Sequence, residues 1–211
     1  MLLSGGIDSA TALYLTKEKQ GVRALTIEYM GIAGSELLAA KAIASRAGVL
    51  EHRMVRLPDL REAADIPGFK PSGLPPTYIP LRNGIFYALA ASYAEETGAT
   101  SIVGGHNRDD AGVFADVSPE FFGSLQRAFL KGSPILQKNN LKIVRPLKSL
   151  TKPEVIRLAD SLGVPLELTW SCNRDSVKHC WSCNGCLTRK RCFKEAGVVD
   201  PLAGSKPEKI T

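Results

Sequence analysis

Short apolar runs alternate with amphipathic stretches along most of this chain. Four runs rich in Val, Leu and Ile predict buried parallel strands: 22–29, 49–57, 100–104 and 141–144. Apolar residues at helical spacing predict helices between them: 10–20, 35–47, 83–97, 118–130 and one that opens at Thr151. With residues 1–3 as the end of a further strand, the alternation predicts an α/β fold with a doubly wound, parallel, five-stranded sheet.

The loop between the first strand and the first helix reads Leu3-Ser4-Gly5-Gly6-Ile7-Asp8-Ser9. Glycines can take positive φ and let backbone N–H groups approach a ligand closely. Ser4, Asp8 and Ser9 are N-cap-type residues beside unpaired N–H groups, which favour a phosphate together with the helix dipole. An ordinary strand-to-helix turn is the alternative. The full Ser-Gly-Gly-x-Asp-Ser pattern favours an anion site over this turn. It lacks the lysine of the common phosphate loop, so the site is of a different kind from that loop.

Two further polar segments follow predicted strands or open predicted helices. Pro80 places Arg82 and Asn83 at a helix N-terminus, where a guanidinium suits a phosphate or carboxylate; a loop arginine with an asparagine cap is an equal alternative. In the segment Gly104–Asp110, His106 could act as acid or base and Asp109 or Asp110 could hold Mg²⁺, unless this is only a capped polar turn. Loops at the carboxyl ends of parallel strands converge, so we expect one shared cavity.

All five cysteines lie in one short region near the C-terminus. Four of them are spaced Cys172-x₇-Cys180-x₂-Cys183-x₂-Cys186, and the x₂ spacings let successive thiolates turn onto one ion. The pattern predicts a closed zinc site with a structural role. An iron–sulfur cluster is the alternative that the spacing does not exclude. The fifth, Cys192, is interpreted as a packed thiol.

Composition narrows the class of protein. A chain of 211 residues, 44% hydrophobic and 23% charged, suits one soluble domain with an appendage. It shows no apolar run that could span a membrane and no signal peptide, so we expect a cytoplasmic protein without a membrane partner. A net charge of +6 permits contact with RNA, but solvated basic faces or bound ATP would account for it equally.

Residues Ser4–Ser9 resemble the pyrophosphate loop of the ATP-pyrophosphatases, which include GMP synthetase, tRNA thiolases and 7-cyano-7-deazaguanine synthases. Other motifs resemble the last family in particular: Thr77-Tyr78-Ile79-Pro80-x-Arg82-Asn83, Ser118–Phe121, Lys152–Ile156, and Thr169-Trp170-Ser171-Cys172 with the cysteines that follow. The resemblance runs nearly end to end. It implies a Rossmann-like fold of the adenine nucleotide alpha hydrolase type and cleavage of ATP between its α and β phosphates.

The resemblance also implies the reaction and the site. Family members are ligases that convert 7-carboxy-7-deazaguanine, ammonia and ATP to 7-cyano-7-deazaguanine, a precursor of queuosine and archaeosine in tRNA. Direct RNA contact is not required, and the enzyme would act alone or as a homodimer. Mg²⁺ would accompany ATP. The expected cofactor-binding residues are Leu3, Ser4, Gly5, Gly6, Ile7, Asp8, Ser9, Tyr29, Asn83 and Gly105, and the expected catalytic residues are Asp8, Ser9, Arg82 and Asp110.

Two segments depart from the family pattern and keep alternatives open. Residues 29–35 lack the polar side chains usual after the second strand, and the Gly-His-Asn-x-Asp-Asp segment at 105–110 resembles tRNA thiolases. A tRNA thiolase or another RNA-modifying enzyme is therefore one alternative, although the first 171 residues contain no cysteine. A non-catalytic nucleotide-binding zinc module is another. We expect an ATP-pyrophosphatase domain at 1–168, a zinc-binding segment at 169–201 and a disordered tail at 202–211.

Overall fold

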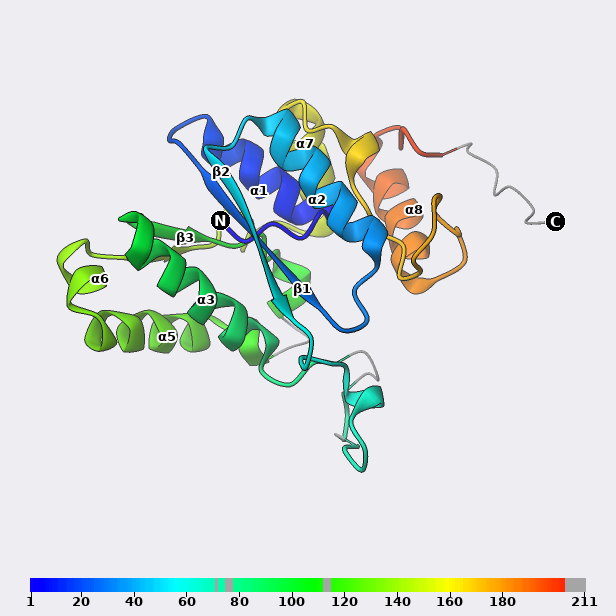
Figure 1. The fold of residues 1–211 in the computed structure, drawn as a ribbon. Coiled ribbons are helices and arrows are strands. Elements are labelled where there is room, and N and C mark those ends of the chain that lie inside the picture. The colour runs from blue at the N-terminus through cyan, green and yellow to red at the C-terminus, as the bar shows by residue number, and fades with distance from the viewer. Residues whose placement is uncertain (71, 75–77, 112–114, 204–211) are drawn as a thin grey trace.

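A computed structural model describes residues 1–70, 72–74, 78–111 and 115–203. Helices pack on both sides of the strands (Figure 1). The strands are β1 (Arg23–Tyr29), β2 (Glu51–Leu57), β3 (Ser101–Val103) and β4 (Lys142–Val144). The α-helices are α1 (Ile7–Lys17), α2 (Gly34–Ala47), α3 (Arg82–Thr97), α4 (Arg108–Ala111), α5 (Pro119–Gly132), α6 (Pro134–Lys138), α7 (Lys152–Ser161) and α8 (Asn184–Ala196). Three short 3₁₀ helices are η1 (Ala63–Asp65), η2 (Ala115–Val117) and η3 (Leu166–Leu168).

The expected five-stranded sheet is not confirmed in the described residues. Strands β1 and β2 form one parallel pair, and β3 and β4 form another. The N-terminal segment lies between the pairs: Leu2 N donates to Val103 O at 3.0 Å, and Leu3 N donates to Leu25 O at 2.9 Å. Leu2 forms only an isolated bridge, with Leu25 of β1. The segment nevertheless joins both sheets by parallel hydrogen bonds.

Alternation along β1 divides the core between two faces. Ala24 packs with α1 and α2, whereas Leu25 and Ile27 pack with α3 and α5, as expected when successive side chains point to opposite faces. The first face is filled by Leu13, Ile43, Ile156 and Phe193, and the second by Tyr87, Ile102, Phe122 and Leu141. The two layers of helices thus enclose the strands, as the alternating pattern predicts.

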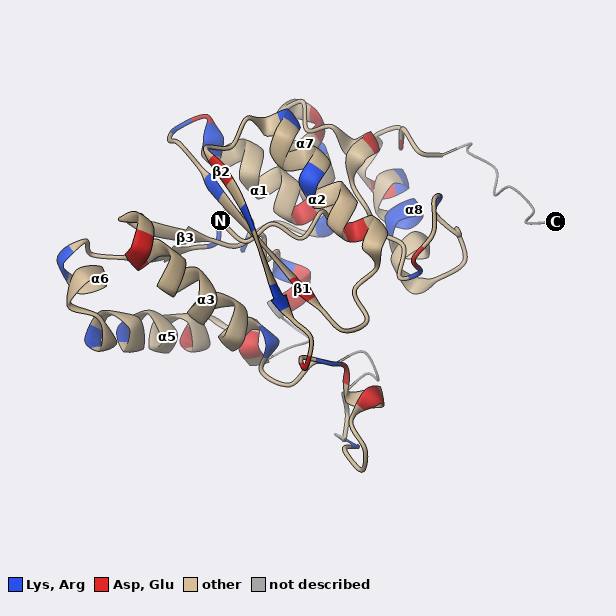
Figure 2. Ribbon diagram, in the orientation of Figure 1, with Lys and Arg blue, Asp and Glu red and all other residues tan. Residues whose placement is uncertain are grey.

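Helix caps fix where several elements begin. The capping box of α7 is confirmed: Thr151 N donates to Glu154 Oε2 at 2.7 Å, and the Thr151 side chain accepts from Glu154 N. Ser118 Oγ accepts from Phe121 N at 3.1 Å and caps α5. No helix in the described ranges is long and apolar enough to cross a membrane. Lys and Arg are spread over several elements rather than confined to one (Figure 2).

The C-terminal segment is held by more than its cysteines. Its helix α8 was not predicted, and Arg189 within that helix has a side chain that is 0% exposed. Arg189 Nε donates to Asp200 Oδ2 at 2.7 Å, Nη2 donates to Oδ1 at 2.8 Å, and Nη1 donates to Thr169 Oγ1. The boundary at residue 168 stays a prediction. Thr77 and residues 204–211 of the expected tail lie outside the described residues.

Replacing Asp200 with alanine leaves the buried Arg189 guanidinium without its counter-ion. Removal of one partner from such a pair typically costs about 3–5 kcal/mol, and we expect a loss of that size in the free energy of unfolding, measured by denaturant titration. The control, Glu195→Ala, breaks the exposed Arg191–Glu195 pair on the same helix and should cost about 0.5 kcal/mol or less. Equal, small losses in both variants would show that the buried pair does not anchor the segment.

Candidate functional site

The glycine loop is shaped by a close approach to α2. Gly5 has a φ of +91°, and a Cβ at this position would lie 2.4 Å from the carbonyl oxygen of Glu36. No side chain fits there, and the positive φ itself favours glycine. Gly6 has a φ of −78°, so the positive φ expected of both glycines holds at Gly5 alone. Gly5 O accepts from Trp170 N at 2.9 Å, which ties the loop to the C-terminal segment.

Hydrogen bonds within the loop leave the first turn of α1 without a side-chain cap. Ser4 N donates to Ser9 Oγ at 3.2 Å, and Ser9 Oγ in turn donates to Gly6 O at 3.1 Å. The N-cap is Gly6, and none of the N-cap-type residues Ser4, Asp8 and Ser9 caps the helix with its side chain. The Ser4 and Ser9 side chains instead brace the loop, and Asp8 lies beside Lys152. The first-turn N–H groups, which have no intrahelical partner, can therefore receive an anion.

A cavity of about 280 Å³ lies beside this loop, where the N-terminal segment, β1 and β3 end. Among the residues expected in the site, it is lined by Leu3, Ser4, Asp8, Ser9, Tyr29, Arg82, Asn83, Gly105 and Asp110. Leu25, Ile27 and Phe86 add an apolar surface. Gly5 faces α2, and Gly6 and Ile7 border a neighbouring cavity instead. The convergence of loops expected at the carboxyl ends of the strands is thus present.

Two carboxylates and one lysine lie at the polar end of this cavity. Lys152 Nζ is 3.8 Å from Asp8 Oδ2 and 3.5 Å from Asp110 Oδ1. Burial raises the pKa of Asp8 to about 6, against the opposing effect of Lys152. Burial would lower the pKa of Lys152, but the two carboxylates outweigh it and raise the pKa. Lys152 was missed from the sequence; its place in the first turn of α7 was the available signal.

The polar residues of the segment after β3 make different contacts. Asp109 Oδ2 accepts from Lys152 N at 3.0 Å, so Asp109 serves α7 while Asp110 lines the cavity. Gly105 permits close packing, because a Cβ there would lie 2.8 Å from the Ser9 backbone. Burial lowers the pKa of His106 to about 4, so its imidazole is neutral near pH 7. Asp110, rather than His106, therefore brings charge from this segment into the cavity.

Arg82 begins α3 at the entrance to a second, larger cavity. The residue before it, Leu81, has a left-handed φ of +52° and is the N-cap, so the alternative of an asparagine cap is wrong. Asn83 N donates to Asp116 Oδ2 at 3.1 Å. The second cavity measures about 450 Å³. The two cavities share Tyr29, Ile32, Glu36 and Arg82, and the larger is also lined by Glu62, Tyr78, Asp116 and 170–173.

Glu36 is the other functional candidate that the sequence analysis missed. It lies in the first turn of α2, after the second predicted strand, and that position at the carboxyl edge of the sheet was the available signal. Burial raises the pKa of Glu36 to about 7, and the Arg82 guanidinium opposes this rise. Arg82 also contacts the Tyr29 hydroxyl, whose pKa is raised first of all by burial. The junction of the cavities therefore holds one arginine and one weakly acidic carboxyl.

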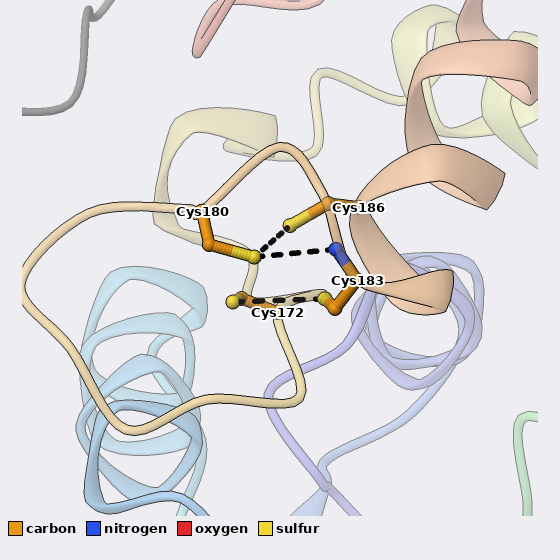
Figure 3. Close-up of side chains that lie close together, drawn as sticks. All are labelled: Cys172, Cys180, Cys183 and Cys186. Carbon is orange, nitrogen blue, oxygen red and sulfur yellow. Dashed lines mark hydrogen bonds between the residues drawn. The ribbon is translucent and has the colours of Figure 1, made fainter.

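The four cysteines predicted from their spacing come together where the segment after η3 meets the first turn of α8, which contains Cys186 (Figure 3). Their sulfur atoms all lie within 4.8 Å of one another, with 3.9 Å between Cys180 and Cys186 and 3.8 Å between Cys172 and Cys183. Tetrahedral zinc with bonds of about 2.3 Å needs sulfur atoms about 3.8 Å apart, so the cluster fits such an ion. Backbone N–H groups of Asn173 and Arg174 donate to two of the sulfurs at 3.4 Å, which favours thiolates.

Two residues near the four cysteines, His179 and Cys192, are not part of the cluster. His179 lies outside the cluster, because its Nε2 accepts from Ser171 N at 3.0 Å. Cys192 is buried in the first core, as expected of a packed thiol. Ser171, Cys172 and Asn173 also line the larger cavity, so the metal-binding segment forms one of its walls.

Comparisons with known proteins agree on one family over nearly the full length of the chain. The family described as "Queuosine biosynthesis protein QueC" matches residues 1–197. A 7-cyano-7-deazaguanine synthase from Thermoplasma acidophilum is 36% identical, with 98% of this chain and 91% of that protein covered. The enzyme of the same name from Acetivibrio thermocellus is 37% identical, with 96% and 95% covered.

A solved structure supports the fold alone. The structure of NMN synthetase from Francisella tularensis has a TM-score of 0.52 and 18% identity, over 94% of this chain and 76% of that one. At this identity the likeness extends to the arrangement of strands and helices, and it carries no information about substrate.

The cysteine cluster predicts one metal ion per chain. Cys183→Ser removes one thiolate and opens the shell, so we expect metal content to fall from about one equivalent to near none, with a large loss of stability. The control, Cys192→Ser, should keep the metal, because that thiol lies in the apolar core. Elemental analysis distinguishes zinc from iron with sulfide. Full metal content in Cys183→Ser would contradict the assignment.

Proposed function

The chain belongs to the family of queuosine biosynthesis protein QueC, and from that membership we propose that it converts 7-carboxy-7-deazaguanine and ammonia to 7-cyano-7-deazaguanine at the expense of ATP. The relatives named above are 7-cyano-7-deazaguanine synthases matched over nearly their full length. The observation that carries the proposal is the smaller cavity, where an uncapped helix N-terminus, paired carboxylates and Arg82 meet. Such an enzyme is a ligase that forms carbon–nitrogen bonds.

In this proposal ATP occupies the smaller cavity. The apolar surface of Leu25, Ile27 and Phe86 suits the adenine ring, and the first-turn N–H groups of α1 suit the phosphates. Asp8 and Asp110 supply the oxygen ligands that Mg²⁺ prefers, and the ion would neutralise phosphate charge. Lys152, which pairs with both carboxylates, holds them in position. Ser9 contributes by holding the glycine loop in shape through its hydrogen bonds.

The proposed reaction begins when the substrate carboxylate meets the α-phosphate of ATP. The carboxylate attacks the α-phosphorus, and pyrophosphate leaves towards the glycine loop. Ammonia then displaces AMP and forms an amide. A second ATP activates the amide through its oxygen, and loss of AMP gives the nitrile. Arg82, at the junction of the cavities, stabilises the charge that develops on the transferred phosphate.

Other parts of the molecule have supporting roles in this proposal. A zinc ion bound by the four cysteines is structural, because four thiolates leave no open position. No cysteine lines the smaller cavity in the described part of the chain, which disfavours a thiolase. The partners are small molecules. A homodimer and a cytoplasmic location stay predictions, and direct contact with RNA is not required.

The product assay tests the proposed function. Purified protein, ATP and ammonium are incubated with and without 7-carboxy-7-deazaguanine, and products are followed by mass spectrometry. We expect the nitrile with AMP and pyrophosphate only when the acid is present, because no lysine follows the glycines to hold the outer phosphates. ADP as the sole nucleotide product, or no acid-dependent turnover, would contradict the proposal.

Arg82 should contribute strongly to turnover. Loss of an electrostatic donor to the transition state typically costs roughly 100-fold in rate, and we expect that from Arg82→Ala. Arg82→Lys keeps the charge but not the planar fork and should recover only part of the rate. Arg127→Ala, which removes an exposed arginine on α5, is the control and should change turnover less than about twofold. Unchanged steady-state kinetics in Arg82→Ala would show that it is only a helix-start residue.

A further inference from the structure

Glu36 occupies a place that the other carboxylates do not share. It lines both cavities, whereas Glu62 and Asp116 line only the larger one. Asp8 and Asp110 line the smaller cavity, and both are paired with Lys152. Among the carboxylates that line these cavities in the described residues, Glu36 alone can reach reacting groups from both sides.

The two cavities together define where the chemistry occurs. If ATP lies in the smaller cavity, the larger one is the place for the bicyclic acid, because it shares Glu36 and Arg82 with the smaller cavity and its volume of about 450 Å³ suits a ligand of that size. Glu62 and Asp116 offer acceptors for ring N–H groups, and Tyr78 and Trp170 offer aromatic surface. The substrate carboxyl and the α-phosphate can then meet only at the junction, beside Glu36 and Arg82.

We propose that Glu36 is the base that accepts a proton from the attacking ammonia when the amide forms. This inference rests on the proposed function, and it adds a catalytic residue to it. The position of Glu36 in the first turn of α2 is fixed by a backbone contact, because the Glu36 carbonyl oxygen packs against Gly5 of the glycine loop. The backbone at the start of α2 is therefore fixed next to the loop.

The step balances as follows. The lone pair of ammonia forms a bond to the acyl carbon of the adenylate, and the bond from that carbon to the AMP oxygen breaks. AMP leaves with the bonding electrons. One proton on the new ammonium-like nitrogen moves to the Glu36 carboxylate and then to water, so that the neutral amide remains.

The electrostatic surroundings suit a base at neutral pH. Burial raises the pKa of Glu36 to about 7, with Arg82 as the opposing charge, and a base is most effective when its pKa lies near the working pH. The groups that face it are Arg82 from α3, Tyr29 from β1, Glu62 and Asp116 across the larger cavity, and Asp8, Asp110 and His106 across the smaller. Asp175 lies behind it, bound to Ser35 at 2.9 Å. Below pH 7 the carboxyl is protonated, so amide formation should rise with pH through 7.

The test separates adenylation from amide formation in the full chain. Exchange of labelled pyrophosphate into ATP, dependent on the acid and without ammonium, reports adenylation. Single-turnover formation of amide on addition of ammonium reports the next step. In Glu36→Gln we expect exchange to persist while amide formation falls about 100-fold or more, and the ratio of the wild-type rate to the variant rate to rise with pH and level off above about pH 7. The titration of ammonia itself is common to both proteins and cancels in the comparison.

Two further variants test whether the effect of Glu36→Gln is only a loss of structure. Glu36→Asp keeps a carboxylate and should restore part of the rate and the pH dependence. Glu120→Gln removes an exposed first-turn glutamate from α5 and should leave both reactions unchanged. Wild-type amide formation in Glu36→Gln, or equal loss of exchange and amide formation, would overturn the assignment. Absence of acid-dependent exchange in the wild-type protein would instead overturn the proposed function.

Discussion

The contact between Gly5 and α2 is the constraint on which the site depends. A left-handed residue with no side chain lets the loop pass directly under the Glu36 carbonyl, and that contact places the start of α1 beside the start of α2. The loop carries the uncapped N–H groups, and α2 carries Glu36. One backbone contact thus sets the separation between the proposed phosphate site and the proposed base.

The C-terminal segment completes the same arrangement from the other side. Trp170 N donates to Gly5 O, and Asp175 holds the first turn of α2 through Ser35. Residues on both sides of the first cysteine line the larger cavity. The buried Arg189–Asp200 pair, together with the metal proposed at the four cysteines, would therefore stabilise a wall of the cavity in addition to closing the fold. This explains why a small cysteine-rich segment is joined to a nucleotide-binding domain.

The sequence predicted those features that depend on spacing and on parallel topology. The cysteine cluster, the capping box and the convergence of Ser4, Arg82 and Asp110 on one cavity belong to this class. It did not predict features that depend on how elements pack. The buried Arg189, which pairs with Asp200, had no signal in the sequence pattern. The orientation of their helices brings Glu36 to both cavities and Lys152 to Asp8 and Asp110, and Met1–Leu3 joins two sheets without forming a strand.

The most direct test of this account compares Gly5→Ala with Gly48→Ala. Both glycines have positive φ, at +91° and +69°, but a Cβ meets the Glu36 carbonyl oxygen only at Gly5 and meets nothing within 4 Å at Gly48. Gly48→Ala should cost about 1–2 kcal/mol of stability and keep acid-dependent exchange of pyrophosphate into ATP. Gly5→Ala should cost more and lose that exchange. Equal stability of the two variants with exchange intact in Gly5→Ala would contradict the account.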